Sequence, residues 1–197
     1  MRRAAVGLRR GCGLLLVLGA VCVSWAGSGL DPVISDLSSR IDDDELLVSF
    51  RLDHALSEDT LERLHSGDAL QFQHRVELIR RKAYWVTPNR TLGRTVVESQ
   101  VEYDSLTRQY RLYRRTENET RGDAQPYVDT EVRRSTKSLA EAVDWLVAMQ
   151  DVPLAWSPDP ALEDRLKVRV ESLFGRRMIL YMVPSRRSIA AELRLEF

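Results

Sequence analysis

The chain has only two cysteines, and both lie in its first 26 residues. Cys12 and Cys22 belong to a short apolar run, Gly11–Val23, that follows two pairs of arginines. If residues 1–26 are removed, the remaining 171 residues have no disulfide, no thiol nucleophile and no thiolate metal ligand. The rest of the chain must then rely on its hydrophobic core, and it is long enough to form one domain of ordinary size.

The sequence also lacks an apolar run long enough to cross a membrane as a helix, which needs about 20 residues. Gly11–Val23 is shorter, has arginines before it, and is followed by the small-x-small triplet Ser24-Trp25-Ala26. This order is typical of a secretory signal peptide. We therefore predict a signal peptide over residues 1–26, cleavage between Ala26 and Gly27, and a periplasmic or secreted location. Lipid attachment at Cys22 is disfavoured because Val21 stands where such sites have Gly or Ala.

Neither sign of charge is in excess, since the chain has 29 basic and 29 acidic residues. Loss of the signal peptide removes four arginines and no acidic residue, which leaves a net charge of −4. A mildly acidic, exported domain is not expected to bind nucleic acid or an anionic membrane surface. We also expect no membrane span after cleavage.

Sequence motifs that indicate catalysis are missing as well. The chain has no Gly-x-Ser-x-Gly elbow, no phosphate-binding loop and no His-Glu-x-x-His. Its three histidines, His54, His65 and His74, match no helical metal-ligand spacing. We predict no catalytic residue, no cofactor and no metal site, and expect His74 to be a hydrogen-bonded core residue on the apolar face of a strand. An enzyme that acts on envelope polymers stays open as an alternative, because catalytic residues can come from loops.

What the sequence does have is period-two alternation of apolar and polar residues, which is typical of half-buried strands. The predicted strands are Val33–Arg40, Glu45–Leu52, Ala69–Lys82, Thr95–Tyr103, Gln109–Arg115, Tyr127–Val132, Leu166–Phe174, Met178–Val183 and Ile189–Phe197. A short helix is predicted over Ser57–His65, with Ser57 as its N-cap and Gly67 at its end. Residues 27–197 are therefore expected to form a single, mainly β domain, an antiparallel β-sandwich of about eight strands with two short helices packed on it.

The second predicted helix, Ser138–Gln150, has an unusually wide apolar arc. We expect Leu139, Val143 and Leu146 to cover an open face of the sheet, with Trp145 at the rim of that contact. Pro153 would prevent the helix from continuing.

Arginines alternate with aromatic residues between Tyr103 and Arg115. On a strand, Tyr110 and Arg111 point to opposite faces, so the simplest interpretation is that arginine stems cover the rim of a sheet. If this segment has a binding role, a carbohydrate, an anionic ligand or a partner protein is the expected occupant. The candidate partner-binding residues are Trp145, Trp85, Tyr110 and Arg108.

The segment Tyr103-Asp-Ser-Leu-Thr-Arg-Gln-Tyr110 resembles an uncharacterised family of bacterial exported proteins of about 200 residues, described only as a domain of unknown function. The Phe50 strand, Ala69-Leu70-Gln71-Phe72, the Trp85 segment and the apolar helix before Pro153 extend the resemblance over most of the chain. It departs near the end, where Val183-Pro184 replaces an expected leucine-proline. The resemblance implies an envelope location, no known activity and a link to an envelope sensor kinase.

The leading hypothesis is therefore a periplasmic, non-enzymatic protein-interaction module of the bacterial envelope, with an unidentified envelope protein as its partner. The alternating residues Ile189–Phe197, which end in a terminal phenylalanine, suggest a small outer-membrane β-barrel as a second hypothesis. An exposed apolar patch or an open sheet edge would favour the first hypothesis.

Overall fold

The computed structural model of the chain describes residues 30–42, 45–80, 89–120, 127–154, 166–179 and 183–195. The predicted signal peptide, its cleavage site at Ala26 and Gly27, and Trp85 lie outside these residues. The described elements are β1 (Val33–Asp42), β2 (Glu45–Asp53), α1 (Glu58–His65), β3 (Leu70–Arg80), β4 (Arg90–Asp104), β5 (Gln109–Thr120), β6 (Tyr127–Thr136), α2 (Leu139–Val147), β7 (Ala148–Leu154), β8 (Leu166–Ile179) and β9 (Val183–Arg194).

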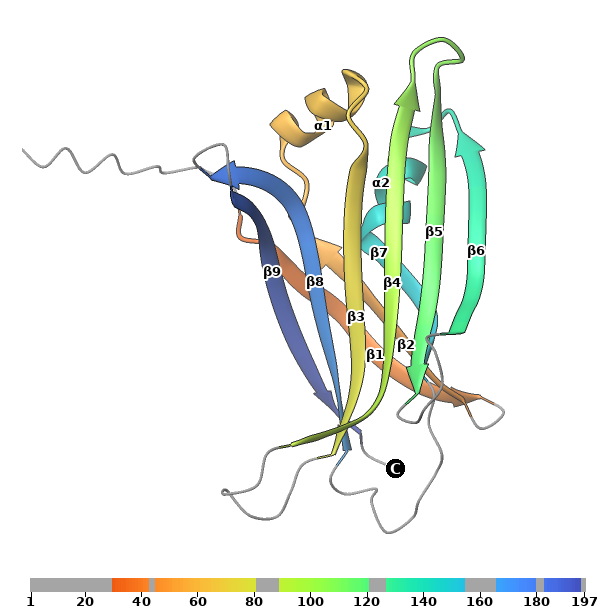
Figure 1. The fold of residues 1–197 in the computed structure, drawn as a ribbon, viewed down its shortest axis with the longest axis vertical. Coiled ribbons are helices and arrows are strands. Elements are labelled where there is room, and N and C mark those ends of the chain that lie inside the picture. Colours follow the sequence, from red (N-terminus) through yellow and green to blue (C-terminus); the bar gives the residue numbers. More distant parts are fainter. Residues whose placement is uncertain are drawn as a thin grey trace, which may run out of the picture.

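The strands form two antiparallel sheets (Figure 1). The larger sheet has the order β6-β5-β4-β3-β8-β9, and the smaller has the order β1-β2-β7 and crosses the larger one diagonally. The prediction of a mainly β, antiparallel sandwich with two helices is confirmed. Among the described residues, neither sheet pairs its first strand with its last. These strands therefore do not form the closed sheet that the outer-membrane hypothesis required.

The inner face of the six-stranded sheet is covered in two different ways. Over one half, the three-stranded sheet packs on it and buries aliphatic residues that include Val48, Leu78 and Val168. Over the other half, the helices pack on it around Phe72, Leu112 and Leu146. We call these two regions the sheet-covered core and the helix-covered core.

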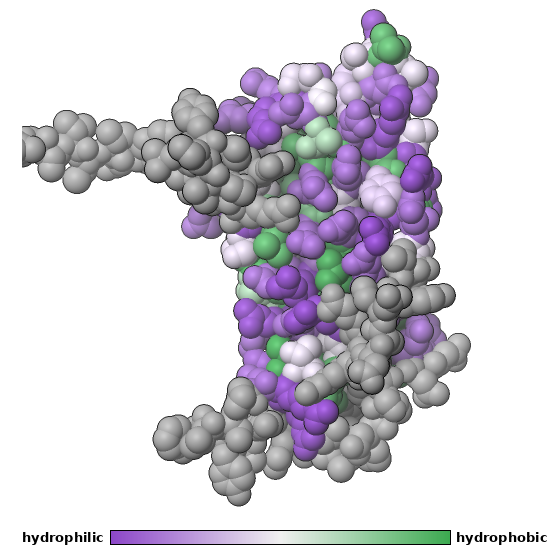
Figure 2. All heavy atoms as spheres, viewed as in Figure 1, coloured by the Kyte–Doolittle hydropathy of each residue, from purple (hydrophilic) through white to green (hydrophobic). Residues whose placement is uncertain are grey.

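The outer face of the six-stranded sheet is a solvated lattice of charged side chains. Arg94 pairs with Glu77 at 2.9 Å, and Lys167 pairs with Glu192 at 2.7 Å, in each case between neighbouring strands. Figure 2 shows this face, on which hydrophilic residues surround scattered apolar ones. The lattice alternates in sign, which keeps the face soluble without creating a field of one charge.

The predicted second helix is three residues too long. α2 ends at Val147, and Ala148 is already extended, with φ −101° and ψ 121°. Residues 148–154 form β7, a strand that the sequence analysis missed, because they pair with β2 through partners such as Phe50 and Met149. Long-range pairing therefore overrides local helix propensity at the end of this segment.

The predicted strand Met178–Val183 is also wrong as a separate element. β8 runs to Ile179 and β9 begins at Val183, and these two residues pair with each other at the end of the β8–β9 ribbon. None of the helices among the described residues is both long and apolar enough to cross a membrane.

Candidate functional site

Trp145 lies at the edge of the contact between α2 and the sheet. Its indole N–H donates to the backbone carbonyl of Tyr113 at 3.1 Å. The guanidinium carbons of Arg114 and Arg134 lie 4.2 Å and 5.6 Å from the centroid of the ring. The half-buried ring is thus held by contacts between α2 and the strands β5 and β6. The position agrees with the rim placement expected from the sequence, while a partner-binding role for Trp145 stays a prediction.

Arg114 is half-buried and points toward the end of α2, so its side chain does not cover the sheet rim as expected from the sequence. It donates to the carbonyl oxygen of Trp145 and, at 3.4 Å, to that of Ala148, two backbone acceptors where α2 ends and β7 begins. Burial and, to a smaller extent, the nearby Arg134 lower the pKa of Arg114 to about 10. This half-buried charge serves as a C-terminal cap for α2.

His74 is fully buried, which confirms the prediction of a core histidine. It also contacts the same end of α2. Its Nε2 lies 3.1 Å from the carbonyl oxygen of Leu146, and its Nδ1 lies 2.8 Å from Oγ of Ser172. Because a carbonyl only accepts, Nε2 carries the proton and Nδ1 accepts from the Ser172 hydroxyl. Burial lowers the pKa of His74 to about 4, so the ring is neutral at physiological pH.

Tyr110 is turned into the molecule, with only 5% of its surface exposed. Its hydroxyl lies 2.8 Å from Nε2 of His65, and its ring centroid lies 5.0 Å from that of Tyr103. His65 Nδ1 in turn lies 2.9 Å from the carbonyl oxygen of Leu61. Burial raises the pKa of Tyr110. These contacts join α1 to the β4–β5 hairpin, so the ring of Tyr110 is not presented to a partner.

Arg108 lies on the surface, in the turn that joins β4 to β5, which extends beyond the neighbouring strands (Figure 1). Its φ of 55° places it in the left-handed region. The carboxylate of Asp104 accepts from the backbone N–H groups of Leu106 at 2.9 Å and Thr107 at 3.3 Å. The hydrogen bond from Thr107 is the main reason why the pKa of Asp104 is lowered. The turn is therefore ordered, with Leu106 94% exposed at its tip.

A groove of about 650 Å³ runs between β1 and β9, which are the edge strands of the two sheets. Leu37 and Ile41 from β1 and Leu193 from β9 line it, together with Leu195. Ile41 is 47% exposed. We call this groove the β1–β9 seam. Both strands are edges of their sheets, and Ile41 is an exposed apolar side chain in the groove, a combination that favours an interaction module.

A second hollow lies where β8 separates from β3. β8 pairs with β3 only as far as Leu173 and Gln73, whereas β3 continues along β4 to Leu70. Beyond Leu173, β8 stays beside β9 alone, with a bulge at Gly175, whose φ is +67°. A positive φ of this kind bends a strand out of regular pairing. The six-stranded sheet is therefore split at this end, and α1 lies over the split (Figure 1).

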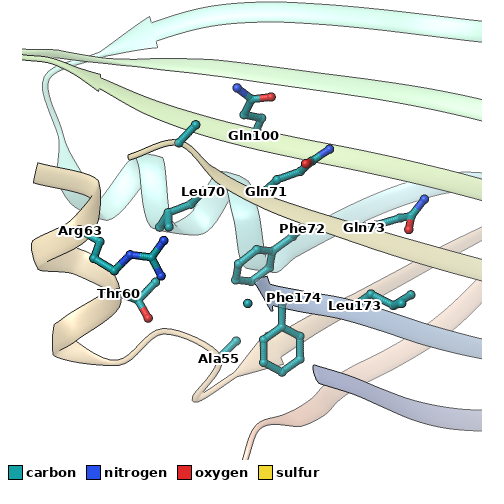
Figure 3. Close-up of a pocket in the computed structure, with 12 residues that line it drawn as sticks. Ala55, Thr60, Arg63, Leu70, Gln71, Phe72, Gln73, Gln100, Leu173 and Phe174 are labelled. Atoms are coloured by element: carbon teal, nitrogen blue, oxygen red, sulfur yellow. The ribbon is translucent and has the colours of Figure 1, made fainter. Parts of the chain in front are cut away.

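The split holds a pocket of about 340 Å³, which we call the β3–β8 pocket. Phe72 and Phe174 form its apolar wall, with ring centroids 5.6 Å apart. Thr60 and Arg63 reach it from α1, and glutamine side chains of β3 and β4 line its other side (Figure 3). The pocket thus combines an aromatic wall, amide groups and a single cation.

Metal ligands do not gather in the described part of the chain, where no three His, Cys, Asp or Glu side chains lie close enough to hold an ion. The three histidines lie on separate elements, with His54 in the turn after β2, His65 at the end of α1 and His74 in β3. The described residues that line the seam and the pocket include no carboxylate.

The sequence analysis did not single out the residues of the β3–β8 pocket as a site. Phe72 and Phe174 fall within the predicted strands Ala69–Lys82 and Leu166–Phe174, and both are buried. A signal was present in Gly175, because a glycine inside a strand marks a bulge or a bend. Arg63 lies in the last turn of α1, next to the buried Leu64, and its position in the pocket follows only from how α1 packs.

Comparison with protein families gives a match to the family described as a domain of unknown function (DUF4390), over residues 31–174. This range begins just before β1 and ends at Phe174 in β8. Comparisons with curated proteins and with solved structures gave no match. The match covers most of the chain and agrees with the resemblance to an uncharacterised family noted above. The chain belongs to the DUF4390 family of domains of unknown function.

Proposed function

We propose that the chain is an exported, non-enzymatic module of the bacterial envelope that binds a partner protein. The observation that carries this proposal is the β1–β9 seam. There, the free edges of two different sheets lie side by side, and Ile41 is 47% exposed beside them.

Open sheet edges favour binding because their backbone N–H and C=O groups can pair with a strand from another protein. Soluble proteins usually protect such edges with charges, bulges or a covering loop. β1 has a bulge between Ser35 and Ser38, but its second half, which borders the seam, pairs regularly with β2 up to Asp42. A partner strand at this position would cover Ile41 and Leu37. An envelope sensor kinase is the first partner to test, as the family resemblance suggests.

The experiment is affinity capture of the tagged, exported protein from cross-linked envelope extracts. Ile41→Asp should remove the partner, because it places a charge in the seam. Leu106→Asp is the matched control, since it makes the same change at an exposed leucine on the β4–β5 turn. Both variants should keep the melting temperature of the wild type. Capture of the same proteins by the wild type and Ile41→Asp would contradict the role of the seam.

Export is tested separately by N-terminal sequencing of the protein isolated from the envelope. We expect the mature chain to begin at Gly27, because the order of basic, apolar and small residues before it is that of a cleaved signal. An intact Met1 on the envelope protein would contradict this part of the proposal.

A further inference from the structure

We propose that the β3–β8 pocket is a binding slot for a short extended peptide that bears a carboxylate and has an apolar side chain at every second position. The slot lies at the far end of β8 from the seam, since the seam is lined by Leu195, which pairs with Leu166 at the start of that strand. The inference therefore concerns a second surface and does not depend on the seam.

The backbone of β3 supplies the first argument. Between Leu70 and Phe72, β3 is paired with β4 on one side, but β8 has already left its other side. Among the described residues no backbone hydrogen bond to another segment replaces that pairing. An extended peptide laid along this edge would pair with the free backbone groups, as in strand addition.

The two walls of the slot supply the second argument. Phe72 and Phe174 line the inner side, whereas the amides of Gln71 and Gln100, which are cross-strand neighbours, lie on the outer side (Figure 3). Successive side chains of an extended peptide point to opposite faces. One set would therefore enter the aromatic wall, and the other would meet the glutamine amides.

Charge supplies the third argument. Arg63 is the single charged residue among the described residues that line the pocket, and its guanidinium is turned toward Leu70 and Phe72 (Figure 3). Asp68 pairs with Nε of Arg63 at 2.9 Å, while the Nη groups carry further N–H donors. A carboxylate is the group that such a guanidinium binds best.

A small amphiphile, such as a fatty acid, would satisfy the aromatic wall and the cation. It would leave the edge of β3 unpaired, because an acyl chain has neither donors nor acceptors. The free strand edge therefore favours a peptide.

The test uses two phage-displayed libraries of random hexapeptides, panned on the purified protein. One library ends in a free C-terminal carboxylate, and the other has further chain on both sides of the random segment. Enrichment from the first library would show that the carboxylate bound by the pocket is a C-terminal one. Enrichment of Asp or Glu from the second library would show that it belongs to a side chain. Either result supports the slot if the enriched peptides have apolar residues at alternate positions.

An enriched peptide is then measured against variants of the protein. Arg63→Gln should weaken its binding about 10- to 100-fold, the usual loss for a hydrogen bond to a charged group. Arg133→Gln is the matched control, because it removes an exposed arginine that pairs with a carboxylate outside the pocket, and it should leave binding unchanged. On peptide binding, the amide hydrogens of Leu70–Phe72 should become protected from exchange.

Three results would overturn the proposal. The first is that neither library yields an enriched peptide. The second is that the enriched peptides bind the Arg63→Gln variant as tightly as the wild type. The third is that they protect backbone amides outside Leu70–Phe72 from exchange. Decanoate is used as a second probe. If it shifts the ring resonances of Phe72 and Phe174 while no peptide is enriched, the pocket takes a small amphiphile and the peptide assignment is wrong.

Discussion

The sheet-covered core and the helix-covered core lie under the same sheet but are built from different residues. The sheet-covered core is aliphatic apart from Phe50 and Met149. The helix-covered core contains Phe72, Tyr110 and Phe174. The buried His74 lies between the two cores, with its ring centroid 5.4 Å from that of Phe50 and 6.3 Å from that of Phe72. The sheet-covered half is thus mostly aliphatic, with Thr95 buried where it donates to the carbonyl oxygen of Pro153 at 2.6 Å. The helix-covered half is more aromatic and has His74 and Arg114 at the end of α2.

The difference follows from the geometry of the covering elements. A sheet lies along another sheet and satisfies its own backbone through its ladder, so aliphatic side chains can fill the space between them. A short helix covers less area and ends in unpaired carbonyl groups, which need donors. Arg114 and His74 supply those donors to α2. The same limited coverage by α1 leaves the β3–β8 pocket open, so the helix-covered half is where a ligand can enter.

The largest expected effects come from removing a leucine from each core. Leu146→Ala and Leu78→Ala should each lower the free energy of unfolding by about 2–5 kcal/mol, because both residues are at most 1% exposed. Leu78→Ala should cost more, since two sheets cannot close on the cavity whereas the nine-residue α2 can shift toward it. Chemical denaturation of the two variants measures the difference. Equal losses would mean that α2 is as rigid as the three-stranded sheet.

The sequence was informative about which faces of the strands are buried and less so about where elements end and which strands pair. Alternation alone placed Phe72, His74 and Val76 on one buried face, because the period of a strand is independent of its partners. It missed β7, since no turn residue separates Val147 from Ala148 and only pairing with β2 makes the segment extended. Leu139, Val143 and Leu146 do pack on the helix-covered core as expected, although Leu146 is the only one of the three that is buried, and Ala142 and Val147 are buried beside it. The pocket depends on where β8 leaves β3, which is a long-range property.

The next effect is a pH dependence that comes from His74, whose ring holds the end of α2. The pKa of His74 is about 4 in the folded chain and 6.5 in a solvated histidine. Between these values the unfolded chain binds a proton that the folded chain does not, so the free energy of unfolding falls as the pH falls. The shift corresponds to a loss of about 3 kcal/mol, which is complete below pH 4.

This pH dependence is measured by denaturation between pH 7 and about pH 4, within the range in which histidines titrate. His74→Gln keeps a donor for the Leu146 carbonyl but does not titrate, so it should lack this component. Carboxylates that titrate in both proteins cancel in the difference. If wild type and variant lose stability in parallel, His74 is not the source.

A smaller effect is expected at Trp145. Trp145→Phe removes the indole N–H that donates to Tyr113 and weakens the contact with Arg114. Each of these interactions contributes about 1 kcal/mol, so the variant should be destabilised by about 1–2 kcal/mol. Thermal unfolding measures this loss. Unchanged stability combined with loss of a captured partner would instead identify Trp145 as an interaction anchor.

The smallest effect is expected at Leu106, on the turn beyond the helix-covered core. Because Leu106 is 94% exposed, Leu106→Ser should change the free energy of unfolding by no more than about 0.5 kcal/mol. The turn is held by Asp104, which accepts hydrogen bonds from two backbone N–H groups, so Asp104→Ala should lower the melting temperature more than Leu106→Ser does. The comparison of these two variants distinguishes Asp104, which stabilises the turn, from Leu106, which is only exposed on it. If Leu106→Ser proved the more destabilising change, the leucine would have to pack against the molecule, and the turn could not project from the sheet as Figure 1 shows.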